Sequence, residues 1–149
     1  MSDAEFVDTN VLVYAHDRDA GSKREVARRL VTSLWRTGRG VLSTQVIAEL
    51  FVVLTRKVAN RLPHAAARRR AALYSRWQIV RPEAADVLDA IDLVESRTVH
   101  FWDALLVVAA QRAGATILWS EDLQAGARFG ALEIRNPFTD PSLIEANAP

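Results

Sequence analysis

Four acidic residues lie inside or directly after apolar segments of this chain: Asp8, Glu49, Asp103 and Asp122. A carboxylate among apolar neighbours is costly to bury unless cations or hydrogen bonds replace the water that it loses. Four such residues, far apart in the sequence, indicate one acidic pocket assembled by folding. Hard divalent cations such as Mg²⁺ and Mn²⁺ take oxygen ligands, and metals held by carboxylates commonly serve phosphate-ester chemistry. The pattern therefore predicts a metal site that acts on phosphate esters.

The four acids have different roles in this prediction. Asp8 is the expected central ligand, Asp103 and Asp122 complete the site, and Glu49 binds directly or through water. Asp103 and Asp122 also have ordinary structural interpretations, as helix-capping or turn residues. Glu121 is an alternative ligand to its neighbour Asp122.

Two polar residues accompany these acids. Asn10 and Ser120 lie close in sequence to Asp8 and Asp122, and either side chain is expected to orient a carboxylate or a water molecule. Turn chemistry is the alternative interpretation of both. The three histidines share no spacing typical of metal ligands, although His16 could face a substrate.

Strands that alternate with helices are expected to position the acids. Apolar runs predict strands at residues 4–8, 40–43, 78–82, 115–120 and 132–136. Helical periodicity predicts two helices that begin near residues 9 and 22, and further helices at 44–58, 63–77, 83–96 and 101–113. The second helix is expected to begin with a capping box formed by Ser22 and Glu25. This order is typical of an α/β domain with a parallel sheet, whose ligands bind beyond the carboxyl ends of the strands. One domain is expected at 1–138, followed by a poorly ordered tail at 139–149.

Composition excludes several classes of protein. The chain has 149 residues and no cysteine, so a disulfide framework, a zinc–thiolate site and a thiol nucleophile are excluded. No apolar stretch is long enough to span a bilayer, and the N-terminus resembles no secretory signal. A cytoplasmic protein without a membrane partner is therefore expected.

Charge is distributed unevenly along the sequence. Residues 1–81 carry 15 Lys and Arg against 7 Asp and Glu, a net +8, and residues 82–149 carry 4 against 11, a net −7. A basic half beside an acidic half suits an enzyme that holds a polyanion near a metal site, although the two could average out in three dimensions. Arginines between 61 and 76 could bind phosphates or simply form a solvated face. The four tryptophans lie in apolar segments and are expected in the core.

The segments that carry the acids resemble a known family. FVDTNVLVYA at the start, the STQVIAEL segment, HFWDALLVVAA, and the closing LWSEDLQAG with IRNPF are similar to the PIN-domain superfamily, and more narrowly to VapC-type toxins of type II toxin–antitoxin pairs. The resemblance covers residues 5–138. The order and the spacing of the acids match the family as well as the local sequences do.

The resemblance implies a three-layer α/β/α fold and a metal-dependent endoribonuclease. Asp8, Glu49, Asp103 and Asp122 match the acidic positions of the family and would bind Mg²⁺, with Mn²⁺ as the other candidate. Asn10 and Ser120 match its accompanying polar positions. The implied partners are RNA as substrate, a second copy of the chain in a homodimer, and a cognate antitoxin that brings DNA contact only indirectly. A non-catalytic PIN-like module that binds RNA or protein is the alternative, although retention of all four acids counts against it.

A phosphatase of the haloacid-dehalogenase type fits the sequence poorly. It also begins with an apolar strand that ends in Asp, but it needs a second Asp two residues later, and Asn10 occupies that position.

Overall fold

The computed structural model describes residues 3–146 of the chain. A six-stranded sheet with strand order β3-β2-β1-β4-β6-β5 forms its centre. The strands are β1 (Glu5–Val7), β2 (Gly40–Ser43), β3 (Gln78–Val80), β4 (Ile117–Trp119), β5 (Arg128–Phe129) and β6 (Leu132–Arg135). Every pair of neighbouring strands is parallel except β5 and β6, which are antiparallel. The sheet is therefore mostly parallel, as the sequence predicts.

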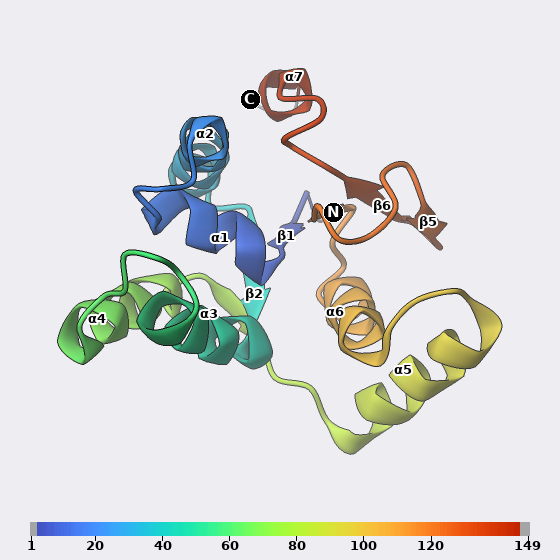
Figure 1. The fold of residues 1–149 in the computed structure, drawn as a ribbon. Coiled ribbons are helices and arrows are strands. Elements are labelled where there is room, and N and C mark those ends of the chain that lie inside the picture. The colour runs from blue at the N-terminus through green and yellow to red at the C-terminus, as the bar shows by residue number, and fades with distance from the viewer. Residues whose placement is uncertain (1–2, 147–149) are drawn as a thin grey trace.

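Helices cover both faces of this sheet. They are α1 (Thr9–His16), α2 (Ser22–Thr37), α3 (Thr44–Arg56), α4 (His64–Tyr74), α5 (Ala84–Ser96), α6 (Phe101–Arg112) and α7 (Ser142–Ala146). Figure 1 shows α2 and α7 on one side of the sheet and α5 and α6 on the other. α1 packs against both α2 and α3. The expected α/β fold with a central sheet between helical layers is thus confirmed.

The central strand explains how distant segments meet. Phe6 of β1 lies opposite Val41 of β2 on one side and Leu118 of β4 on the other. These three side chains are fully buried or nearly so, in accord with a sheet that is covered on both faces. Because all three strands are parallel, their carboxyl ends, followed by Asp8, Thr44 and Ser120, lie at the same edge.

The end of the chain differs from the expected tail. Residues 142–146 form α7, which packs on α2 with Ile144 buried. The sequence predicts a poorly ordered tail from residue 139, whereas burial of the apolar side chain of Ile144 favours docking of this short helix. Residues 147–149, also assigned to the tail, lie outside the described residues.

The start of α2 differs in detail as well. Gly21 occupies the N-cap position, with φ of 63°, and no side chain caps the helix there. Ser22 is instead the first helical residue, so the expected capping box with Glu25 does not form. A capping box does occur at α5, between Glu83 and Asp86. The helices described at residues 3–146 are all too short or too polar to cross a lipid bilayer.

Candidate active site

Asp8 connects the central strand to the first helix. It follows β1 and is the N-cap of α1, where its Oδ1 accepts a hydrogen bond of 2.6 Å from the backbone N–H of Thr9. Its Oδ2 accepts a hydrogen bond of 2.9 Å from the hydroxyl of Ser120. Only 4% of the residue is exposed to solvent. Both oxygens are thus held in place at the edge of the sheet.

Ser120 links the turn after β4 to Asp8. Its side chain is fully buried, and its Oγ accepts hydrogen bonds from the backbone N–H groups of Asp122 and Leu123, at 3.1 Å and 3.3 Å. With its single proton donated to Asp8, the hydroxyl fixes the position of the Asp8 carboxylate relative to the turn that carries Asp122. Ser120 thus lies in hydrogen-bond contact with Asp8, and an orienting role stays a prediction.

Glu49 approaches from α3. Its Oε2 accepts a hydrogen bond of 2.8 Å from the hydroxyl of Thr9, and its Oε1 accepts one of 2.8 Å from the side-chain amide of Gln45. Gln45 lies one helical turn before Glu49, which is the spacing at which side chains on a helix meet. Neither Thr9 nor Gln45 is among the site residues predicted from the sequence. Their nearness in sequence to Asp8 and Glu49 is the only signal that could have revealed them.

Asp122 and Asp103 complete the acidic group. The side-chain amide of Asn10 donates to Oδ2 of Asp122 over 3.1 Å, which ties the start of α1 to the turn after β4. Asp103 is half-buried in the first turn of α6, where the helix dipole favours a negative charge. All four acids and Asn10 line one cavity of about 440 Å³.

The pKa values show that these acids share one electrostatic environment. The pKa of Asp8 is raised to about 7, mainly by burial and also by the charges of Asp122 and Asp103, while the hydrogen bonds from Ser120 and Thr9 act to lower it. The pKa of Asp103 is also raised, first by burial and then by Asp122 and Glu49, while His100 lowers it. Charge on one of these acids therefore affects the protonation of others in the same cavity.

Few cations of the protein face this negative charge. Lys57 lines the cavity, but within residues 3–146 none of the ion pairs includes Asp8, Glu49, Asp103 or Asp122. A group of carboxylate and amide oxygens with surplus negative charge is the kind of donor set that Mg²⁺ and Mn²⁺ select. Over the same residues, no three acidic or histidine side chains already lie close enough to enclose one ion. The donor chemistry fits a hard cation, although three of these side chains would have to lie closer together to enclose one.

Glu121 points to different partners from those of Asp122. Its carboxylate accepts hydrogen bonds from the hydroxyl of Tyr14 and, over 2.7 Å, from the ammonium group of Lys23. Lys23 also lies over the rings of Tyr14 and Phe138, at 4.9 Å and 5.4 Å from their centroids. Glu121 does not line the cavity that holds the four acids. This geometry favours Asp122 as the fourth acid of the site.

His16 lies in a different cavity from the acids. Its Nε2 is 2.6 Å from the hydroxyl of Tyr74, and the cavity of about 350 Å³ around it is also lined by arginines, namely Arg18, Arg24, Arg28 and Arg70. The pKa of His16 is lowered to about 4, mainly by burial and also by the charges of nearby arginines, namely Arg70, Arg28 and Arg24. The histidine is therefore neutral at pH 7 and does not contact the acidic site.

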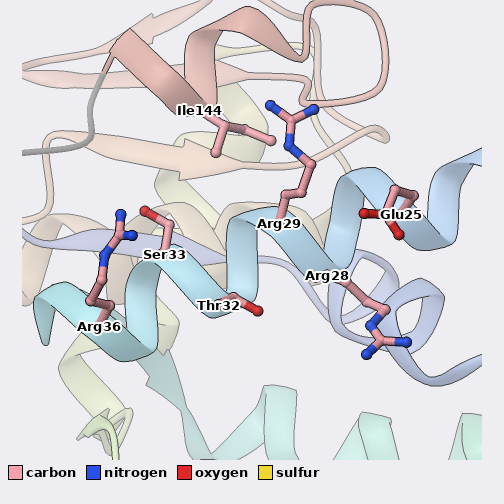
Figure 2. A pocket seen from close by; sticks show the side chains of 7 residues that line it. All are labelled: Glu25, Arg28, Arg29, Thr32, Ser33, Arg36 and Ile144. Atoms are coloured by element: carbon pink, nitrogen blue, oxygen red, sulfur yellow. The ribbon is translucent and has the colours of Figure 1, made fainter.

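A third cavity lies between α2 and α7. Figure 2 shows Arg29 and Ser33 on the side of α2 that faces Ile144, with Arg28 and Thr32 farther around the helix. Its volume is about 500 Å³, and among the described side chains that line it are Glu25 and three arginines. None of these residues lines the acidic cavity.

Solved structures resemble this fold. VapC20 of Mycobacterium tuberculosis, described as a toxin that cleaves the sarcin–ricin loop, has a TM-score of 0.63 and 20% identity, over 80% of this chain and 92% of its own. VapBC2 of Rickettsia felis, solved bound to a DNA fragment from its promoter, has a TM-score of 0.61 and 18% identity, over 89% of this chain and 98% of the matched chain. No curated protein sequence matches this one. The model of the PIN domain matches residues 6–128, and the chain therefore belongs to the PIN-domain family.

Proposed function

We propose that this chain is a metal-dependent endoribonuclease that hydrolyses phosphodiester bonds of RNA in the acidic cavity. The observation that carries the proposal is the convergence of four carboxylates, from four separate segments, on one cavity. The raised pKa values of Asp8 and Asp103 support it, because burial and the charges of neighbouring acids raise both, and no ion pair among the described residues includes either group.

In this proposal the side chains have distinct tasks. Asp8, Asp103 and Asp122 would hold Mg²⁺ or Mn²⁺, with Glu49 binding directly or through water. The bound ion would supply a nucleophilic water of lowered pKa and stabilise charge on the phosphate oxygens.

The neighbouring polar groups orient these ligands. Ser120 fixes Asp8, Asn10 fixes Asp122, and Thr9 with Gln45 fixes Glu49, each by a side-chain hydrogen bond. Such outer groups set the direction of the ligand oxygens and their basicity. Lys57 at the cavity would attract the phosphate backbone of the substrate.

A toxin role is the finer part of the proposal. Membership of the PIN-domain family and the likeness in fold to VapC20 and VapBC2 support it. We infer a cognate antitoxin as partner, with DNA contacted only through that antitoxin, and a cytoplasmic homodimer as the working form. Titration of the purified chain with a separately purified candidate antitoxin, followed by light scattering, tests the assembly.

The nuclease activity is tested by cleavage of total cellular RNA. The purified wild type is compared with Asp8→Asn and Asp103→Asn, each with Mg²⁺, with Mn²⁺ and with excess chelator. Asp89→Asn is the matched control, because it makes the same chemical change at an exposed position of α5. We expect discrete fragments only from the wild type and the control, and only with metal. Cleavage in excess chelator, or full activity of Asp8→Asn, would contradict the proposal, and absence of all cleavage would favour a non-catalytic binding module.

A further inference from the structure

Trp102 is exposed, although its apolar segment predicts a place in the core. Its exposed fraction is 63%, against 38% for Trp35, 9% for Trp77 and 0% for Trp119, so the expectation is wrong for Trp102 and also for Trp35. The residues that follow it in α6, Ala104–Ala110, are all buried, so the helix is anchored firmly just beyond the indole. A large aromatic side chain left in water on a rigid element is unusual, because its burial would be favourable.

The position of Trp102 relates it to the acids. It directly precedes Asp103 and lines the same cavity as the four carboxylates. The ring of Phe101 meets the indole in an edge-to-face arrangement, with centroids 5.0 Å apart and planes at 72°. Edge-to-face contacts between aromatic rings are favourable, so Phe101 restricts the orientation of the indole.

The cavity has a polar part and an apolar part. Trp102 and Leu106 of α6 and Ala48, Val52 and Val53 of α3 provide the apolar lining, and the four acids with Lys57 provide the charged lining. Val52 is 40% exposed, so the apolar lining on α3 is also open to solvent. A nucleotide has the same two-part chemistry, since its phosphate is charged and its base presents an apolar face. With a bound cation the charged lining would suit any phosphate ester, whereas the apolar lining suits one that carries a base.

We propose that the indole of Trp102 stacks on an unpaired base of the RNA next to the phosphate that is cut, and so positions single-stranded RNA in the acidic cavity. The proposal rests on the proposed nuclease function and adds how the substrate is recognised. Stacking needs a base that is free of its own helix, so the expected substrate class is a single-stranded segment or a loop. Because every base has a flat face, Trp102 supports binding with little sequence preference.

Binding is measured separately from cleavage to test this proposal. All proteins carry Asp8→Asn so that the RNA stays intact, and fluorescence anisotropy follows a labelled single strand of roughly 12 nucleotides in Mg²⁺. Stacked bases contribute enough affinity that Trp102→Ala should bind about 5- to 100-fold more weakly. Trp102→Phe should restore most of the loss. Leu88→Ala, at an apolar residue of α5 with 61% exposure outside the cavity, is the matched control and should bind like the parent.

Two further measurements distinguish stacking from other roles of the indole. Intrinsic fluorescence should be quenched by the single strand in the parent protein and much less in Trp102→Phe. The same strand annealed to its complement should bind with little dependence on residue 102. Equal binding by Trp102→Ala, or a change of oligomeric state in that variant by light scattering, would overturn the proposal.

The outcomes also separate this proposal from the nuclease proposal. RNA binding that depends on Trp102, without cleavage by the wild type in any metal, would leave the stacking role intact and remove the enzymatic one. Cleavage by the wild type and by Trp102→Ala with equal kcat and KM would support the nuclease proposal and overturn the stacking role. Failure of the parent protein to bind single-stranded RNA would overturn the stacking role directly.

Discussion

The buried carboxylate of Asp8 should make the metal-free protein less stable than it would be with an amide at that position. The pKa of Asp8 is raised from 3.8 to about 7, mainly by burial. A difference of roughly 3 pKa units corresponds to about 4 kcal/mol between the two protonation states. Asp8→Asn removes this charge at nearly constant volume. It leaves the Ser120 hydroxyl without its acceptor at Oδ2, which costs about 1 kcal/mol. The free energy of unfolding of Asp8→Asn at pH 8 should therefore exceed that of the wild type by about 3 kcal/mol.

The sign of the pH dependence follows from the raised pKa. The folded protein holds the Asp8 proton more tightly than the unfolded chain, so this contribution to stability is complete below about pH 4 and is lost as the pH rises through 7. His16 acts in the opposite direction over part of this range, because its folded pKa is lowered to about 4. The quantity to compare is therefore the difference between the wild type and Asp8→Asn, in which the contribution of His16 cancels.

Urea unfolding in excess chelator at pH 4, 6 and 8 measures that difference. We expect the variants to be similar in stability at pH 4 and Asp8→Asn to be more stable by about 3 kcal/mol at pH 8, a rise in Tm of roughly 6–12 °C. Asp89→Asn again serves as the control, with no pH-dependent difference expected. A difference between Asp8→Asn and the wild type that stays constant from pH 4 to 8 would refute the reasoning.

Three other perturbations test separate parts of the structure. Asp122→Asn should raise the Mg²⁺ concentration needed for RNA cleavage by at least about tenfold, whereas Glu121→Gln should leave it nearly unchanged; equal effects in initial-rate assays would show that the cavity does not distinguish the two acids. Gly40→Ala should destabilise the fold by about 1–3 kcal/mol in urea unfolding, because the added methyl group would lie 2.4 Å from ring carbons of Trp77. An unchanged midpoint of urea unfolding would show that the indole of Trp77 can move aside without cost. His16→Gln should become more stable relative to the wild type as the pH falls from 6.5 to 4. Over this range His16 binds a proton in the unfolded chain but not in the folded protein, which favours unfolding of the wild type alone. A pH-independent difference in the same assay would contradict this.

The positions of the acids could be predicted because they depend on local patterns and one general rule. Asp8 and the segment around Asp122 follow apolar runs that predict buried strands, and the carboxyl ends of parallel strands lie at a common edge of the sheet. The structure places both residues at that edge and brings Asp103 and Glu49 to the same cavity. Their chemical roles stay predictions, since they depend on an ion and a substrate.

The features that were not predicted depend on tertiary contacts. β5 has two residues, too few to show any periodicity, and it exists because it pairs with β6. α7 is held by the contact of Ile144 with α2. The exposure of Trp102 depends on which side of α6 faces the sheet and α5, and an apolar residue in an apolar run gives no signal of this.

The hydrogen bonds that orient the acids were only partly predictable. Ser120 and Asn10 lie beside acids in the sequence, so an orienting role could be expected. The bond from Thr9 to Glu49 joins residues 40 positions apart, and it depends on how α1 packs against α3. Such a contact is set by three-dimensional packing and leaves no trace in a single sequence.

The strand order has a consequence for the synthesis of this protein. β1 lies in the middle of the sheet, with β2 and β3 on one side and β4, β6 and β5 on the other. During synthesis β1 therefore cannot pair with β4 until more than a hundred further residues have been added to the chain. The acidic cavity needs residues from both sides of β1, from Asp8 through Asp122. A nascent chain attached to the ribosome therefore lacks a complete site until Asp122 has emerged and β4 has paired with β1.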